Sequence, residues 1–225
     1  MDSYFTIQNI ENILYKDKAS KFIGYAYSVN SEFEIKERLE LVKQLHPKAT
    51  HHCYAYRLGL DKNNYRSNDD GEPNGTAGKP ILGQIDSFSV TNVLVIVVRY
   101  FGGTKLGVSG LIDAYKECAK MTLQSTQIIE QKIMNYYEIR CDYTSINKVY
   151  QIINNTKAAI VEQQVDNQSS FLIALESNKI KDVEKWAGTS RSANDGLLLI
   201  SGICKRFASG VKLSRFPTIV KCVDS

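Results

Sequence analysis

The sequence predicts an α+β protein made of two units. A helix with one apolar stripe is expected at Glu32–His46, and a continuously apolar strand at Val93–Phe101. After residue 132 the apolar patterns follow the order strand, helix, strand, strand, helix, which is typical of a ferredoxin-like half-barrel. The length of 225 residues fits one large domain or two modest ones.

The first unit begins with a predicted strand at Lys21–Val29, which is rich in aromatic and aliphatic residues. Ser31 is suited to cap the following helix, with Glu34 as its capping-box partner. The helix ends at His46 because a residue before proline is pushed out of the helical region. Its apolar stripe consists of Ile35, Leu39, Val42 and Leu45.

Further along the first unit, His51–Leu60 predicts a second strand and Tyr65–Lys79 a long polar loop with three glycines. A short helix is expected at Pro80–Ser87. The strand at Val93–Phe101 is apolar without alternation, so both of its faces should be buried. Two glycines end it, and a helix is expected from about residue 107 to about residue 130.

The second unit is also predicted to contain both strands and helices. Strands are expected at Ile133–Cys141, Ala159–Val165 and Ser170–Glu176, and helices at Ser145–Asn155 and Lys179–Trp186. Leu197–Ile203 could supply the last strand of a ferredoxin-like sheet. We therefore expect a domain at 1–132, a ferredoxin-like domain at 133–186 and an atypical basic segment at 187–225.

Composition excludes several classes of protein. The longest aliphatic run has six residues, Val93–Val98, whereas a membrane-spanning helix needs about 20. The N-terminus has no pattern of a secretory signal. Five cysteines without a CxxC pair argue against a disulfide framework or a structural zinc site. We expect a cytoplasmic protein that makes no contact with a membrane.

The net charge of +4 is unevenly distributed along the chain. Residues 187–225 carry a net charge of +4, whereas residues 1–132 carry +1 and residues 133–186 carry −1. Overall charge therefore gives no sign that the body of the protein binds polyanions, and such a role must depend on local clusters.

Two segments have the composition of a binding site, Asp69–Leu82 and Arg99–Tyr115. In the second, a buried strand leads through a glycine-rich turn into a helix, whose free N–H groups and dipole attract anions, most simply phosphate. The candidate anion- or RNA-binding residues are Arg99, Lys105, Gly102, Gly103, Gly107, Lys79 and Arg57. The alternative is that Gly102, Gly103, Gly107 and Gly110 only serve a tight turn and close helix–strand packing.

Known nucleotide motifs are absent. A P-loop would need glycine at position 73 and Ser or Thr at position 80, but both positions are proline. The Rossmann pattern G-x-G-x-x-G is also missing from both segments. We expect no cofactor.

Other side chains could bind a metal or act in catalysis, but a structural role is the favoured interpretation for each. Asp69, Asp70 and Glu72 could hold Mg²⁺, but a solvated loop with an Asx turn at Asp70 is the favoured interpretation. His51 and Cys53 share one face of a strand and could form a Cys/His pair, but free cysteines are usually buried core residues. No metal site is predicted.

Aromatic residues accompany several of the basic ones. Those that could stack on bases near Arg57, Arg66 and Arg99 are Tyr54, Tyr56, Tyr65 and Tyr100. Aromatic residues in strands are more often part of a core or of a sheet face.

The ordered set HHCYAYR, DDGEPNGTAGKPIL and VVRYFGGTKLGVSGLIDAY resembles the YigZ/IMPACT family of translation-linked proteins over roughly residues 4–130. Residues 133–186 resemble that family's C-terminal domain, which is similar to the last domain of elongation factor G. The matching positions in the loop are Asp70, Gly71, Glu72, Pro73, Gly75, Thr76, Ala77 and Gly78. Those around the turn are Arg99, Tyr100, Gly102, Gly103, Leu106, Gly107 and Gly110.

The resemblance implies a first domain of the β-α-β type found in a small-subunit ribosomal protein and in elongation factor G domain IV. It implies no catalytic residue. Residues 187–225 do not resemble the family and are either a basic extension or a divergent C-terminus. Eukaryotic members carry an extra N-terminal module that binds a regulator of a translation-controlling kinase, and we expect that this partner does not carry over to this sequence.

Three functions remain open. The leading hypothesis is a non-enzymatic regulator of translation that binds RNA or the ribosome through the glycine-rich cationic turn. The second is an enzyme that acts on a phosphorylated metabolite or nucleotide and uses the same turn to hold phosphate. The third is a protein–protein adaptor with its interface on the ferredoxin-like domain.

Overall fold

The computed structural model describes residues 3–61, 63–176, 179 and 198–203. Contacts between Cα atoms divide the chain into two compact units, one at 4–131 and the other from residue 132 onward together with residues 1–3. None of the helices in the described ranges is long and apolar enough to cross a membrane. The α+β class expected from the sequence is confirmed.

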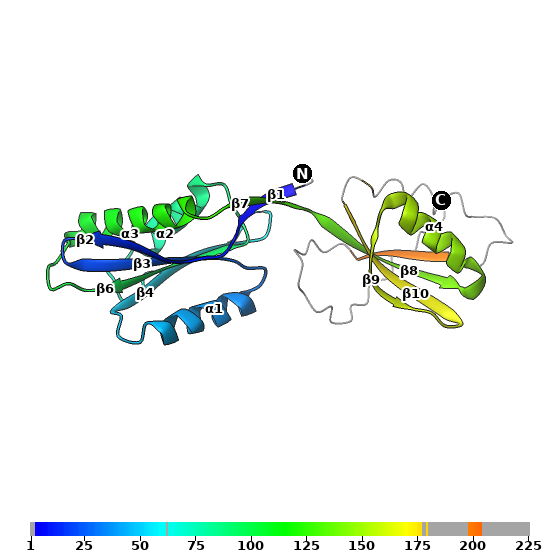
Figure 1. The fold of residues 1–225 in the computed structure, drawn as a ribbon, viewed down its shortest axis with the longest axis horizontal. Coiled ribbons are helices and arrows are strands. Elements are labelled where there is room, and N and C mark those ends of the chain that lie inside the picture. The colour runs from blue at the N-terminus through cyan, green and yellow to red at the C-terminus, as the bar shows by residue number, and fades with distance from the viewer. Residues whose placement is uncertain (1–2, 62, 177–178, 180–197, 204–225) are drawn as a thin grey trace. The chain divides into compact units, whose positions relative to one another are not determined.

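The first unit is a three-layered sandwich with a five-stranded antiparallel sheet in the middle. The strand order is β2 (Ile10–Asp17), β3 (Ser20–Ser28), β6 (Val93–Tyr100), β4 (His51–Leu58) and β5 (Asn64–Asn68). Helix α1 (Glu32–Leu45) covers one face, and helices α2 (Gly78–Ser87) and α3 (Gly107–Gln124) cover the other (Figure 1).

The central strand β6 is buried on both faces, as its unbroken apolar run predicts. Its side chains alternate between two cores. Val93, Val95 and Val97 pack in the core beneath α2 and α3. Leu94, Ile96 and Val98 pack in the core beneath α1. This strand therefore joins the two layers of helices.

Helix α1 begins with the predicted cap. The backbone N–H of Glu34 donates to the Ser31 Oγ at 3.2 Å, and the Glu34 carboxylate accepts from the N–H of Asn30 rather than from that of Ser31. Ile35 and Val42 of the predicted stripe are buried. Leu45, the last residue of the helix, is 55% exposed, so the prediction that it belongs to the buried stripe is wrong.

Pairing between distant strands accounts for the elements that the sequence patterns missed. The predicted helix from residue 107 ends at Gln124 instead of about residue 130, because Ile128–Lys132 forms strand β7 against strand β1 (Ser3–Ile7). Strand β2 pairs with β3, and part of the expected loop at 65–79 forms β5 against β4. Strands β1, β5 and β7 have only five residues each, and β2 has no fully buried side chain.

The second unit is a four-stranded antiparallel sheet in the order β11-β8-β10-β9. Its strands are β8 (Met134–Asp142), β9 (Ala159–Gln164), β10 (Gln168–Glu176) and β11 (Leu198–Ile203). Helix α4 (Ile146–Thr156) packs on one face and follows a short 3-10 turn at Tyr143–Ser145.

The last strand, β11, lies beside the first strand of this unit, β8, as a ferredoxin-like sheet requires. Part of the segment expected to be atypical, 187–225, thus belongs to the sheet. The helix expected at Lys179–Trp186 lies, apart from residue 179, outside the described residues.

Candidate functional site

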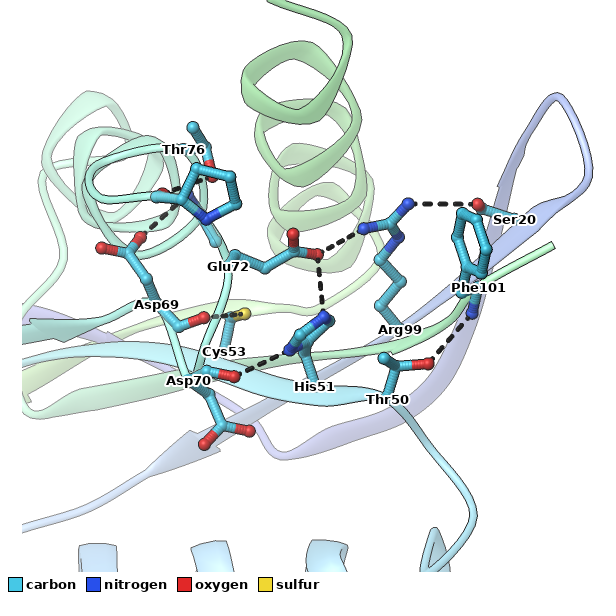
Figure 2. A network of polar contacts seen from close by, with 12 residues as sticks. Ser20, Thr50, His51, Cys53, Asp69, Asp70, Glu72, Thr76, Arg99 and Phe101 are labelled. Atoms are coloured by element: carbon cyan, nitrogen blue, oxygen red, sulfur yellow. Dashed lines mark hydrogen bonds and ion pairs between the residues drawn. The ribbon is translucent and has the colours of Figure 1, made fainter. Parts of the chain in front are cut away.

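The two segments singled out in the sequence meet at one end of the first unit's sheet. The loop at 69–78, here called the signature loop, points Glu72 toward the Arg99 guanidinium near the end of strand β6 (Figure 2). There the Glu72 Oε1 accepts hydrogen bonds from the Arg99 Nη1 at 2.6 Å and from the Tyr115 hydroxyl at 2.8 Å. Only 4% of the Glu72 side chain and 6% of the Arg99 side chain are exposed.

This buried ion pair changes the role expected for Arg99. A second guanidinium nitrogen, Nη2, donates to the Ser20 Oγ, and the Nε is buried without a partner among the described residues. Because a buried charge is stable only when it is paired, Glu72 and Arg99 hold each other in place. The Arg99 charge is therefore compensated inside the protein rather than offered to a ligand.

His51 lies at the rim of the same network. Its Nδ1 donates to the backbone carbonyl of Asp70 at 2.8 Å, since a carbonyl oxygen only accepts. Its Nε2 lies 3.8 Å from the Glu72 Oε1. The imidazole thus joins strand β4 to the signature loop.

The three carboxylates of the signature loop have separate partners. The Asp69 carboxylate accepts from the backbone N–H groups of Gly75, Ala77 and Gly78, so it caps the start of α2. Burial by itself would raise the pKa of Asp69, but these three donors and Lys79 together lower it. The helix N-terminus is therefore satisfied from within the chain.

Asp70 points away from Glu72 and accepts from the backbone N–H of His52 at 2.6 Å (Figure 2). The expected Asx turn is formed by Asn68, whose side chain accepts from the Asp70 N–H. No group of three or more potential metal-binding side chains is found within the described ranges. The expectation of a solvated loop is therefore wrong for Glu72, which is buried, and the Asx turn is made by Asn68 rather than by Asp70.

Cys53 is a core residue. Its Sγ lies 3.0 Å from the Asp69 carbonyl and 3.3 Å from the Tyr115 hydroxyl. Burial raises the pKa of the Cys53 thiol, so the thiolate needed for nucleophilic attack is disfavoured. His51 and Cys53 share a strand face as predicted, but they do not form a Cys/His pair.

The glycines near the site serve two structural purposes. A Cβ on Gly102 would lie 2.0 Å from the backbone of Ala19, and a Cβ on Gly78 would lie 2.6 Å from the N of Asn68, so both positions need the close approach of two chain segments. Gly71, Gly75, Gly103 and Gly107 have positive φ values between 77° and 88°, which favour glycine.

The start of α3 differs from that of α2. Neither helix is capped by the side chain of its own N-cap residue or has an acidic residue in its first turn. Asp69 binds the first N–H groups of α2, whereas within the described residues no side chain binds those of α3. Lys105 is exposed beside it, and Lys79 is exposed in the first turn of α2. The geometry expected for an anion site therefore remains at the start of α3, with Lys105 as its exposed cation.

Arg57 lies away from these residues. On β6 the register places Arg57 opposite Val93 and His51 opposite Arg99. Six strand residues span roughly 20 Å, so Arg57 lies at the other end of the sheet. It is buried and its Nη2 lies 2.5 Å from the Asp86 carboxylate, so it is not brought to the predicted site.

Sequence reasoning missed a group of exposed lysines at the Arg99 end of the sheet, which we call the lysine cluster. They come from the end of β2, the start of β3 and the turn between them, from the end of α1 and the loop after it, and from the glycine-rich turn before α3. Contacts such as the Phe101 N–H donating to the Thr50 Oγ1 and the Gly102 N–H donating to the Ser20 Oγ bring these segments together. The cluster consists of Lys16, Lys18, Lys21, Lys43, Lys48 and Lys105.

The segments that carry the cluster contain few acidic residues. Its three segments, 16–21, 43–50 and 99–105, contain one carboxylate, Asp17. Across the part of the chain that the structure describes, no ion pair joins any of the six lysines to a carboxylate. Single lysines scattered over 90 residues give no sequence signal, because only the fold places them together.

Comparison with known proteins gives consistent matches. Residues 18–123 match the Impact N-terminal domain family. IMPACT family member YvyE of Bacillus subtilis is 31% identical over 186 residues, which cover 83% of this chain and 86% of that protein. IMPACT family member YigZ of Escherichia coli K12 is 30% identical over 179 residues, which cover 78% of this chain and 88% of that protein.

A solved structure described as the crystal structure of a hypothetical protein is similar over nearly the whole length. It covers 92% of this chain and 100% of its own at 28% sequence identity, with a TM-score of 0.71. The similarity therefore includes residues of both units.

Proposed function

This chain belongs to the IMPACT family, and we propose that it is a regulator of translation that binds RNA or the ribosome without catalysing a reaction. The lysine cluster carries this proposal. It gives the first unit a strongly cationic end, although residues 1–132 as a whole carry a net charge of only +1. Such an uneven distribution is the electrostatic footprint of a polyanion-binding surface.

The cluster includes part of the glycine-rich turn that the sequence marks as a candidate anion-binding segment. Lys105 belongs to the glycine-rich turn, and Lys18 flanks the backbone segment against which Gly102 packs. We infer that RNA phosphates contact these exposed ammonium groups, while Arg99 supports the surface from below through Glu72. Lysines on flexible stems adapt to phosphates at different spacings, which suits binding to a backbone rather than to one base sequence.

The groups that could perform chemistry are engaged elsewhere. The carboxylates of Asp69 and Glu72 accept hydrogen bonds that hold the fold, and the Cys53 thiol is buried with a raised pKa. This favours a binding role over catalysis.

One feature favours a second candidate function, an enzyme for a phosphorylated metabolite or nucleotide. The start of α3 has no side-chain cap, and Gly107 and Lys105 stand beside it. A thermal-shift screen of nucleotides and sugar phosphates, with and without Mg²⁺, tests it. A ligand at 100 times its dissociation constant should stabilise the protein by about 2.7 kcal/mol.

The direct test of the proposal is co-sedimentation of the full chain with ribosomes at low and physiological salt. The variant Lys21→Glu/Lys105→Glu should lose ribosome binding, because it removes two cations and adds two like charges in the cluster. The variant Lys36→Glu/Lys116→Glu is the matched control, since it changes the overall charge equally at exposed positions on α1 and α3. Equal binding by the two variants would contradict the proposal.

A second arm tests the C-terminal segment, which also carries positive charge. Truncation before β11 would remove a strand from the sheet of the second unit. The five basic residues beyond that strand should instead be replaced by glutamine in the full chain; they are Lys205, Arg206, Lys212, Arg215 and Lys221. We expect this variant to retain binding that depends on Lys21 and Lys105.

A further inference from the structure

A shallow hollow lies next to the lysine cluster, on the face of the sheet that α1 covers. Its volume is about 410 Å³, and it is lined by Ala19, Lys21, Ile23, His46, Tyr100 and Phe101. Five strands span roughly 20 Å, whereas a helix is about 10 Å wide, so one helix cannot cover the whole face. The hollow lies where α1 ends, at His46.

Hydrogen bonds hold the floor of the hollow in one arrangement. The Tyr25 hydroxyl donates to the Asn12 Oδ1 and therefore accepts from the His46 Nε2. The Tyr100 hydroxyl then donates to the His46 Nδ1, at 2.9 Å. Burial, and then the nearby His52, lower the pKa of His46, which favours the neutral ring that this chain of bonds needs.

Phe101 forms an exposed aromatic wall of the hollow. Its side chain is 47% exposed although it follows a buried strand. The Arg99 guanidinium carbon lies 5.5 Å from the centre of the Phe101 ring and 5.5 Å from that of Phe22. Because Glu72 fixes Arg99, the guanidinium supports the Phe101 ring from inside the protein.

Cations lie beside this aromatic wall. On the same sheet face, Lys21 is opposite Lys16 on β2 and opposite Tyr100 on β6. Lys105 follows Phe101 by four residues, and Lys48 precedes Thr50, which binds the Phe101 N–H. An apolar ring flanked by cations complements a ligand that alternates flat bases with phosphates.

We propose that this hollow binds unpaired nucleotides of single-stranded RNA, with a base stacked on Phe101 and the adjoining phosphates against Lys21 and neighbouring lysines of the cluster. This inference rests on the proposed function and names the form of RNA. In a duplex the bases are stacked inside the helix and present no face to a side chain, whereas a single strand can splay a base onto an aromatic ring.

The test is fluorescence anisotropy of the full chain with a labelled single-stranded RNA of 12 nucleotides and with the same RNA annealed to its complement. The single strand should bind more tightly than the duplex. Phe101→Ala should weaken single-strand binding roughly tenfold, because stacking on one aromatic side chain contributes that order of affinity. Phe101→Tyr should retain it, and Phe33→Ala should leave it unchanged, since Phe33 is exposed on α1.

Three results would overturn the inference: equal affinity for single strand and duplex, equal binding by Phe101→Ala and Phe33→Ala, or tighter binding of an oligoglutamate peptide of the same charge as the RNA. Ribosome binding that depends on Lys21 and Lys105, without single-strand binding, would overturn this inference and leave the proposed function standing. Absence of both kinds of binding would overturn the two together.

Discussion

The signature network around Glu72 and the hollow beside Phe101 lie at the same end of the sheet but differ in burial and in the pairing of their charges. The network is buried, and its charges are paired within the chain. The hollow is open, and the lysines around it have no carboxylate partner within the described ranges. The family motif contributes to both regions, since Glu72 and Arg99 form the buried pair, whereas Tyr100 and Phe101 line the hollow.

Arg99 connects the two regions. It belongs to the family motif and pairs with Glu72, yet its guanidinium also lies against the Phe101 ring. The comparison therefore predicts that changes in the network mainly alter stability, whereas changes in the hollow mainly alter binding.

The largest effect is expected from breaking the buried pair. Glu72→Met or Arg99→Met alone should lower the free energy of unfolding by about 3–5 kcal/mol, because each leaves an uncompensated buried charge. The double variant should cost much less than the sum of the two, since both charges are then absent. Urea denaturation followed by circular dichroism measures all three, and additive costs would show that the pair is not coupled.

The next largest effect is expected at Gly102. Gly102→Ala should cost about 1–3 kcal/mol, because its Cβ would overlap the backbone of Ala19, which can move only with the turn after β2. Gly83→Ala is the matched control, since nothing lies within 4 Å of its Cβ position in helix α2. That change should stabilise the protein by up to about 1 kcal/mol. Thermal unfolding of both variants is the measurement, and a neutral Gly102→Ala would disprove the close approach.

A smaller and pH-dependent effect is expected at Asp69. Its pKa is lowered in the folded state, so its charged form stabilises the fold at pH values above the unfolded pKa of about 3.9. This stabilisation is lost as the pH falls through the folded pKa. Asp69→Asn should therefore cost about 1 kcal/mol at pH 7 and less at pH 3.

The control for Asp69→Asn is Asp113→Asn, which changes an exposed carboxylate on α3. Urea denaturation of the three proteins at both pH values measures the difference. A cost of Asp69→Asn that does not change with pH would show that its charge has no part in capping α2.

The smallest effect on stability is expected in the lysine cluster. Lys48→Gln should leave the free energy of unfolding within about 0.5 kcal/mol of its original value. It should reduce the slope of log affinity for single-stranded RNA against log salt by about 0.7, the value for one phosphate contact. Anisotropy titrations at several salt concentrations measure the slope, with Lys36→Gln as the control, and an unchanged slope would remove Lys48 from the surface.

Much of the fold could be predicted because burial leaves local patterns. The unbroken apolar run of β6 predicted its two buried faces, and Ser31 with Glu34 predicted the start of α1. Strands β1, β2, β5 and β7 were missed because their side chains are largely exposed or the strands are short. Their existence depends on partners such as β3 and β4, which lie elsewhere in the chain.

The candidate site was only partly predictable for the same reason. The sequence marked the signature loop and the strand-to-helix turn as candidate binding segments, and it named Glu72 and Arg99. It predicted that Arg99 binds a ligand, whereas in the structure the Arg99 guanidinium forms an ion pair with Glu72, 27 residues away. It assigned Arg57 to the same surface, although the register of β4 places this residue at the opposite end of the sheet.

The sequence by itself determined the order of the main elements, the two-faced burial of β6, the glycine positions of the turns and the membership of a family. Each of these depends on residues close together in the chain, or on a motif long enough to be recognised. The tertiary structure alone decided which charges are paired inside and which face solvent. Charge pairing depends on distance in space, and lysines as far apart in the chain as Lys16, Lys48 and Lys105 become neighbours only when the sheet has brought three loops to one end.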